Sequence, residues 1–156
     1  MRSVRLGRLF DAVFIQDALS YMASRGDLAR ALTTAYVHCR PGGAALFAPD
    51  WTAERFRPST AHGGHDQGDR GLRYLEWTTD EDPADERYSV YMVYVLREGR
   101  RVRASAVDRH VCGLFPESVW LELIEQAGFR AKRLPFRHSD FQGEEHSLFV
   151  GIKPSR

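Results

Sequence analysis

The sequence is poor in cysteine, contains no long apolar run and has almost no net charge. Its two cysteines, Cys39 and Cys112, cannot form a disulfide framework and lack the spacing of a metal site, which favours a reducing cytoplasm. The longest apolar runs, such as Tyr88 to Leu96, are too short to cross a bilayer. Because 22 Lys and Arg balance 21 Asp and Glu, the formal charge is only +1, which disfavours nucleic acid and anionic lipid as partners.

The composition suits one packed domain. A chain of 156 residues with 43% hydrophobic and 28% charged residues is long enough to bury a core and polar enough to stay soluble. Lysine is nearly absent and arginine is abundant, which indicates a GC-rich bacterial coding sequence. We therefore expect a single domain over residues 1–156.

The N-terminal third has the pattern of a strand, a helix and a second strand. Leu9 to Ile15 is a short apolar run, as in a parallel strand covered on both faces. Ser24 and Asp27 form a capping box that predicts a helix from Arg25 to Arg40. A second apolar run follows at Ala44 to Ala48. This spacing predicts a parallel crossover unit.

The middle of the chain changes character. Thr52 to Gly71 is rich in glycine and histidine and has little apolar content, so we expect a long surface loop or lid. Three antiparallel strands are expected next, at Tyr74 to Thr79, Tyr88 to Arg97 and Arg101 to Val111. The middle strand is apolar on both alternating faces, so each face should meet the main domain, a ligand or another subunit.

The C-terminal third predicts a helix and a closing hairpin. Pro116 suits a first helical turn and Gly128 a C-terminal stop, with apolar residues at helical spacing between them. Two short strands are expected at Ala131 to Phe136 and Ser147 to Ile152, separated by the polar loop His138 to His146. This suits an antiparallel pair.

These pieces, in this order, resemble the class I S-adenosylmethionine-dependent methyltransferases. The segments Phe10-Asp-Ala-Val-Phe and Cys39-Arg-Pro-Gly-Gly-Ala-Ala-Leu-Phe47 are similar to the family's fourth and fifth strands. His110-Val-Cys-Gly-Leu-Phe115 and Glu125-Gln-Ala-Gly-Phe129 are similar to the stretch before its last two strands. The resemblance implies an α/β fold with part of a Rossmann-like sheet, closed by an antiparallel hairpin, and a lid and three-stranded β-meander inserted at residues 52–112.

The sequence lacks the family's Gly-x-Gly-x-Gly cofactor loop. It therefore corresponds to the C-terminal half of a methyltransferase, with strands in the spatial order four, five, seven and six. The edge of Phe10 to Ile15 would then be open. We predict that another chain pairs with this edge or that Met1 to Arg8 covers it.

The resemblance implies methyl transfer from S-adenosylmethionine to a nitrogen or oxygen of a small molecule. The inserted meander resembles the subgroup that methylates amino sugars and similar compounds, where it roofs the pocket and helps to form homodimers. Without the glycine loop, this chain alone is expected to bind the cofactor weakly or not at all and to be inactive. One alternative is a non-catalytic, methyltransferase-derived module for dimerisation or small-molecule binding. Another is an unrelated α/β domain, in which the first two strands are not adjacent.

Candidate ligand residues follow the first two strands, because open parallel sheets bind ligands outside the carboxyl ends of their strands. By resemblance, Gln16 and Asp17 pass the methionine part of the cofactor, or else only cap the loop. Tyr21 lines the substrate pocket or acts as a hydrophobic staple before Ser24.

Three further groups have candidate chemistry. Asp50 and Trp51 follow the second strand, where a carboxylate and an aromatic face suit an amine substrate; Trp51 alternatively packs in the core or lid. His110 matches a recurrent histidine of the subgroup and is the candidate catalytic proton acceptor, or else structural. The run His62-Gly-Gly-His65-Asp66 suggests a metal, but a mobile loop is favoured and no metal is expected. We expect the arginines around Glu98-Gly99 to lie at a solvated hairpin tip.

Overall fold

The computed structural model describes residues 1–136 and 146–155. They divide into two compact units, which are described separately: one contains Met1–Phe56 and the chain from Gly113 onward, and the other contains Arg57–Cys112. The second unit covers most of the segment that the sequence suggests is an insertion. The expected polar loop from His138 lies outside the described residues.

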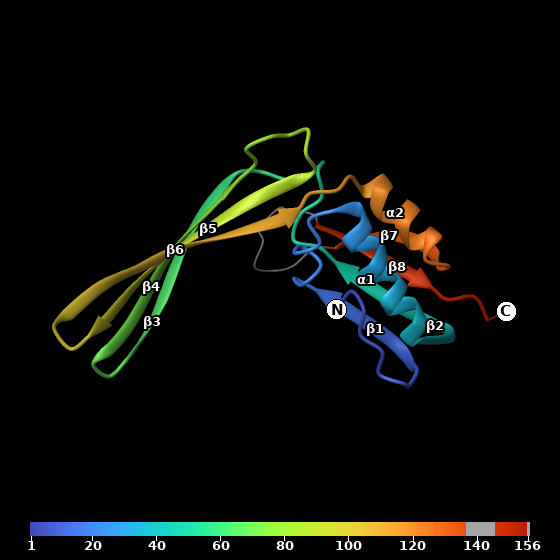
Figure 1. Ribbon diagram of the computed structural model, residues 1–156, viewed down its shortest axis with the longest axis horizontal. Helices are drawn as coiled ribbons and strands as arrows, with labels where there is room; N and C mark the ends of the chain where they lie inside the picture. Colours follow the sequence, from blue (N-terminus) through green and yellow to red (C-terminus); the bar gives the residue numbers. More distant parts are fainter. Residues whose placement is uncertain (137–145, 156) are drawn as a thin grey trace. The chain divides into compact units, whose positions relative to one another are not determined.

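Sheet A, in the first unit, has the strand order β1-β2-β8-β7 (Figure 1). Its strands are β1 (Phe10–Gln16), β2 (Cys39–Ala48), β7 (Arg130–Phe136) and β8 (His146–Ile152). The β1–β2 pair is parallel, whereas β2–β8 and β7–β8 are antiparallel. This confirms the predicted order and the closing hairpin. The unrelated α/β domain is wrong, because it required the first two strands to be apart.

Helix α1 (Arg25–His38) begins where the sequence predicts and ends two residues early. The Ser24 hydroxyl accepts a hydrogen bond from the Asp27 backbone N–H at 3.1 Å, which confirms Ser24 as the N-cap of the helix. The chain turns extended at Cys39, so β2 begins earlier than expected. Position 43 requires glycine, because a Cβ there would lie only 2.7 Å from the Asp11 carbonyl oxygen of β1.

Helix α2 (Glu117–Gln126) has Pro116 at its N-cap, one position outside the first turn expected for it. Gly128 ends the segment with φ +105, as predicted. Both helices pack on one face of sheet A, where Trp120 of α2 stacks on Phe149 of β8 at a centroid distance of 5.3 Å. The core therefore lies between the two helices and this face.

In the described part of the chain, Met1 to Arg8 adds no strand to the open edge of β1. These residues instead contact α1: the Leu6 N–H lies 2.9 Å from His38 Nε2, and the Thr34 hydroxyl donates to the Arg2 carbonyl at 3.1 Å. Strand β1 remains at the edge of sheet A, with Phe14 60% exposed. Pairing with another chain stays a prediction.

Sheet B forms the second unit and has the order β3-β4-β5-β6. Its strands are β3 (Ser59–Gln67), β4 (Arg70–Thr79), β5 (Arg87–Glu98) and β6 (Arg101–Gly113). The meander therefore has one strand more than expected, because β3 lies inside the segment predicted as a loop. The glycine-rich composition of β3 is not typical of a strand. Gly63 and Gly64 leave room for Tyr74 and for the Leu72 carbonyl of β4, and backbone pairing with β4 stabilises β3.

Within the described residues, neither helix is long and apolar enough to cross a membrane. Both cysteines are buried, as predicted. Burial raises the pKa of the Cys39 thiol, so this residue behaves as a small apolar side chain.

Candidate functional site

The candidate site in the first unit is the carboxyl edge of sheet A, which we define as residues 16–21 after β1 and 49–51 after β2. Gln16 pairs in register with Ala48, so the two strands end at the same level. Asp17 has φ +42, and its carbonyl accepts from the Ser20 N–H at 2.9 Å, which folds the chain into a tight turn. Aspartate tolerates this conformation better than most residues.

Ser20 joins the two loops of the carboxyl edge. Its hydroxyl donates to Asp50 Oδ2 at 2.7 Å, and its carbonyl accepts from the Gly113 N–H at 2.7 Å. The side chain of Ser20 is 4% exposed, whereas Asp50 is exposed. Ser20 therefore fixes the Asp50 carboxylate beside the loop that follows β1. No sequence pattern indicated this serine, because its partners are 30 or more residues away.

Tyr21 is 52% exposed, whereas its neighbours Ser20 and Met22 are buried. The staple interpretation of Tyr21 is therefore wrong, because Met22 is the apolar residue that enters the core ahead of Ser24. The ring of Tyr21 lies at the surface of the carboxyl edge. Its role in substrate binding stays a prediction.

Trp51 is half-buried at the end of the carboxyl edge. Its ring packs edge-on against Phe56 at a centroid distance of 5.7 Å, and His146 of β8 lies at 6.3 Å. This is the packing alternative that the sequence left open. It leaves part of the indole exposed, so the same ring can pack within the protein and still present a face to a ligand.

The loop after Trp51 is tied to the start of α2. The Glu54 carboxylate accepts from the Glu117 N–H at 3.0 and 3.2 Å, which caps the helix where Pro116 supplies no side-chain cap. The Ala53 N–H donates to the Phe115 carbonyl at 3.1 Å. These contacts fix the segment on which Trp51 and Phe56 lie.

A polar network at Glu117 strengthens this attachment. Its carboxylate pairs with Arg55 at 3.3 Å and with Arg133 of β7 at 2.7 Å, and the Ser147 hydroxyl donates to it. Burial acts to raise the pKa of Glu117, but the hydrogen bond from Ser147 and the two arginines outweigh it and hold the pKa below its usual range. Sequence reasoning missed this residue, since its partners come from three separate segments.

His110 lies in the second unit, on β6. It is half-buried, and its Nε2 lies 3.1 Å from Asp108 Oδ2, two residues earlier on the same face of the strand. A carboxylate in this position orients the imidazole ring. The spacing Asp-x-His on a strand was the available signal for Asp108. His110 therefore belongs to the second unit. The other five predicted site residues lie together at the carboxyl edge of sheet A in the first unit: Gln16, Asp17, Tyr21, Asp50 and Trp51.

The histidine-rich run does not form a ligand set. His62 and His65 lie three residues apart on β3, so their side chains leave opposite faces of the strand. Asp66 pairs with Arg73, and with Arg97 at 3.4 Å. The hydrogen bond from Arg73 lowers the pKa of Asp66, with Arg97 adding to the effect. The mobile-loop interpretation of this run is wrong as well, since all these residues lie on a paired strand.

Comparison with known proteins identifies the fold. The chain is 26% identical over 155 residues to dTDP-4-amino-2,3,4,6-tetradeoxy-D-glucose N,N-dimethyltransferase of Saccharopolyspora spinosa, covering 98% of this chain and 59% of that protein. It superimposes on Streptomyces venezuelae DesVI with a TM-score of 0.81 and 24% identity, covering 97% of this chain and 62% of that one. The chain has a methyltransferase fold.

A second methyltransferase structure supports the same conclusion. CalS10, an amino pentose methyltransferase of Micromonospora echinaspora solved with bound S-adenosylmethionine, matches with a TM-score of 0.77 and 18% identity, over 97% of this chain and 61% of that one. No family model matches the chain. The chain thus spans about three fifths of the length of these methyltransferases. The resemblance expected from the sequence is confirmed, and β1, β2, β8 and β7 correspond to strands four, five, seven and six of the methyltransferase sheet.

Proposed function

We propose that this chain supplies the substrate side of an S-adenosylmethionine-dependent methyltransferase that acts on the amino group of a small molecule, with an amino sugar as the preferred class. The observation that supports it is the Ser20–Asp50 hydrogen bond, which joins the loop after β1 to the loop after β2 at the edge where parallel sheets bind ligands. The named relatives act on amino sugars, which favours nitrogen over oxygen as the acceptor.

The residues of the carboxyl edge suit part of the cofactor. The exposed Gln16 and Asp17 offer polar groups beside a tight turn, which fits the amino-acid end of S-adenosylmethionine. The sequence contains no Gly-x-Gly-x-Gly loop for the remainder, so residues 1–156 alone should bind weakly. When bound, the cofactor supplies a methyl group on a positively charged sulfur.

Asp50, Trp51 and Tyr21 would hold the amine. The Asp50 carboxylate attracts a protonated amine, and the exposed parts of the two rings provide faces for the cation and for the sugar body. The amine must lose its proton before its lone pair can attack. That His110 is a catalytic proton acceptor stays a prediction from the sequence; in the structure its ring lies beside Asp108 within the second unit.

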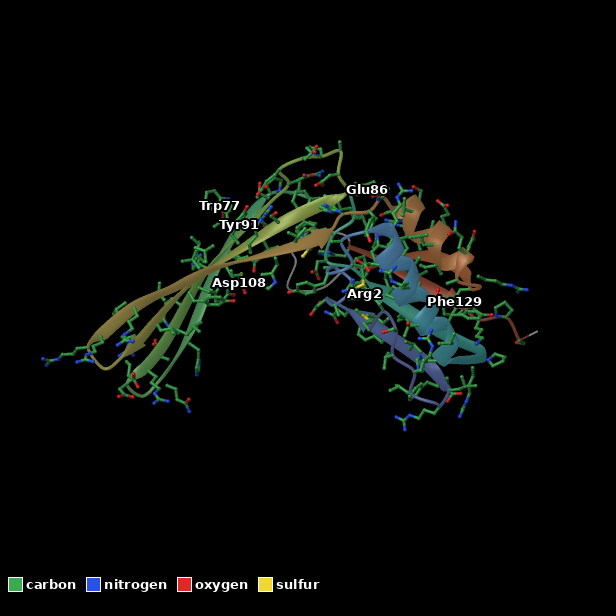
Figure 2. The ribbon with its side chains drawn as sticks, in the orientation of Figure 1. Arg2, Trp77, Glu86, Tyr91, Asp108 and Phe129 are labelled. Carbon is green, nitrogen blue, oxygen red and sulfur yellow. The ribbon has the colours of Figure 1, made fainter. Side chains whose placement is uncertain are left out.

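A second copy of the chain is the proposed partner of sheet B. Residues 57–112 contain no helix, and one face of the sheet presents Trp77, which is 61% exposed, and Leu75. Trp77 lies directly opposite Tyr91 of β5, and Figure 2 shows both on the same side of the sheet. Such a face is stabilised when another apolar surface covers it. Sedimentation should give a dimer that Trp77→Glu dissociates; a monomeric wild-type chain at micromolar concentration contradicts this.

The alternative is a non-catalytic binding or dimerisation module. Titration with S-adenosylhomocysteine, followed by calorimetry and amide NMR up to millimolar concentration, separates the two. We expect weak, saturable binding that Gln16→Ala weakens about threefold to tenfold, the worth of one hydrogen bond. Gln126→Ala on the exposed side of α2 is the matched control and should bind as the wild type does. Absence of binding would overturn the methyltransferase proposal in favour of the module.

A further inference from the structure

One end of sheet B, which we call the arginine end, consists of residues 66–73 and 97–103 with the β3–β4 and β5–β6 turns. The Gly99 N–H of one turn donates to the Asp69 carbonyl of the other at 2.8 Å, so the two turns lie side by side. This end has three acidic residues, two of which pair with its own arginines. The arginines are twice as many: Arg70, Arg73, Arg97, Arg100, Arg101 and Arg103. The arginine end therefore has a net positive charge.

The opposite end of sheet B has the loop between β4 and β5, residues 80–86, which we call the acidic loop. It contains no basic residue and five acidic ones: Asp80, Glu81, Asp82, Asp85 and Glu86. The Asp82 N–H donates to Asp80 Oδ1 and the Ala84 N–H to Asp82 Oδ1, each at 3.1 Å, so the loop is held in successive turns. Arg109 of β6 pairs with one of the five acids at 3.1 Å and an arginine follows the loop, which leaves the acids in excess.

The exposed apolar face that carries Trp77 lies between these two ends. Its residues on β4 pair in register with residues of β5 on the same face: Arg73 with Val95, Leu75 with Val93, and Trp77 with Tyr91. Leu75 and Val93 lie near the middle of their strands, with Trp77 toward the acidic loop and Arg73 toward the arginine end. A two-fold axis through Leu75 therefore brings Trp77 of each copy toward Arg73 of the other, which suits an indole and a guanidinium.

We propose that two copies of the chain stack through their Trp77 faces with the sheets in opposite directions, so that the acidic loop of each lies against the arginine end of the other. The inference rests on the dimer proposed above and adds its direction and the charges that set it. A two-fold interface repeats every contact, so the favourable pairing of opposite charges forms twice. Stacking in the same direction places like charges together, which costs free energy.

Sedimentation equilibrium of charge-reversed chains tests the contacts. Arg100→Glu with Arg101→Glu should weaken the dimer about tenfold, because each lost surface ion pair counts twice. Asp82→Lys with Asp85→Lys should weaken it similarly. All four substitutions in one chain should restore dimerisation, since opposite charges again meet only if the sheets run in opposite directions.

Two controls accompany the charge reversals. Glu125→Lys, exposed on α2, is the matched control and should dimerise like the wild type. Raising the salt concentration from about 0.1 M to about 1 M should weaken the wild-type dimer, because the screening length falls from about 10 Å to about 3 Å. Unchanged thermal melting of each variant should confirm intact folding.

A nitroxide label at Arg100→Cys measures the direction itself, since both native cysteines are buried. With the sheets in opposite directions, the two labels of a dimer lie about 40 Å apart, the length of the twelve-residue β5. Electron–electron resonance should give this distance. Labels within about half of that strand length indicate sheets in the same direction and overturn the proposal.

Two further outcomes would overturn the proposal. A dimer that neither pair of reversals weakens, or that the four substitutions fail to restore, contradicts the direction alone and leaves the dimer standing. A wild-type chain that stays monomeric contradicts both the dimer and its direction. Neither outcome affects the methyltransferase proposal, which the titration with S-adenosylhomocysteine tests separately.

Discussion

Sheet A is covered by helices on one face, whereas sheet B has no helix in its own unit. One face of sheet A is packed under α1 and α2, with Trp120, Phe47 and Phe149 fully buried. Sheet B has no helix in its own unit, and large apolar side chains such as Trp77 remain exposed. Sheet A therefore has the core that makes its unit stable. Sheet B keeps an exposed apolar surface, and the proposed dimer face lies on it.

The largest expected effect is on the core of sheet A. Trp120→Ala removes an indole that stacks on Phe149 and leaves a cavity, so the free energy of unfolding should fall by about 3–5 kcal/mol. Urea denaturation followed by circular dichroism measures it. A loss below about 1 kcal/mol would mean that the face under α2 is not the core that we describe.

The next effect concerns the carboxyl edge. Ser20→Ala removes the hydroxyl that donates to Asp50, and we expect a loss of about 1–2 kcal/mol in unfolding free energy, together with weaker amine binding. Ser155→Ala, at an exposed position, is the matched control. If the two variants are equally stable, Ser20 does not hold the two loops together.

The third prediction concerns acid stability. Because the folded-state pKa of Glu117 is lowered, its ion pairs stabilise the fold at pH values above the unfolded pKa, and this contribution is lost as the pH falls through the folded pKa. Unfolding measured as a function of pH should show a decline below about 4.5, the usual value for Glu, that Glu117→Gln reduces. Glu125→Gln, exposed on the same helix, should keep the wild-type profile.

The smallest expected effect is on the stability of sheet B. Trp77→Ala changes an exposed ring, so the unfolding free energy measured at dilute, monomeric concentration should change by less than about 0.5 kcal/mol. The contrast with Trp120→Ala, the same substitution in the other sheet, directly measures the difference between the two sheets. A large loss for Trp77→Ala would contradict the view that this face lacks cover within a single chain.

The sequence predicted the elements whose signals are local. The Ser24 cap, the Gly128 stop and the apolar runs of sheet A gave the helices, the parallel pair and the closing hairpin. The strand β3 was missed because glycine and histidine provide little β-propensity, and its pairing with β4 is decided by space beneath Tyr74. Ser20 and Glu117 were missed because their partners are distant in sequence. Tertiary hydrogen bonds of this kind leave no periodic pattern.

The most direct test of the account is a crystal structure of the chain grown with a high concentration of S-adenosylhomocysteine. We predict the amino-acid end of the ligand beside Gln16 and Asp17, with Asp50 held by Ser20 on the adjacent loop. Ligand density elsewhere on the chain, with the carboxyl edge of sheet A empty, would contradict the proposal that this edge belongs to a methyltransferase active site.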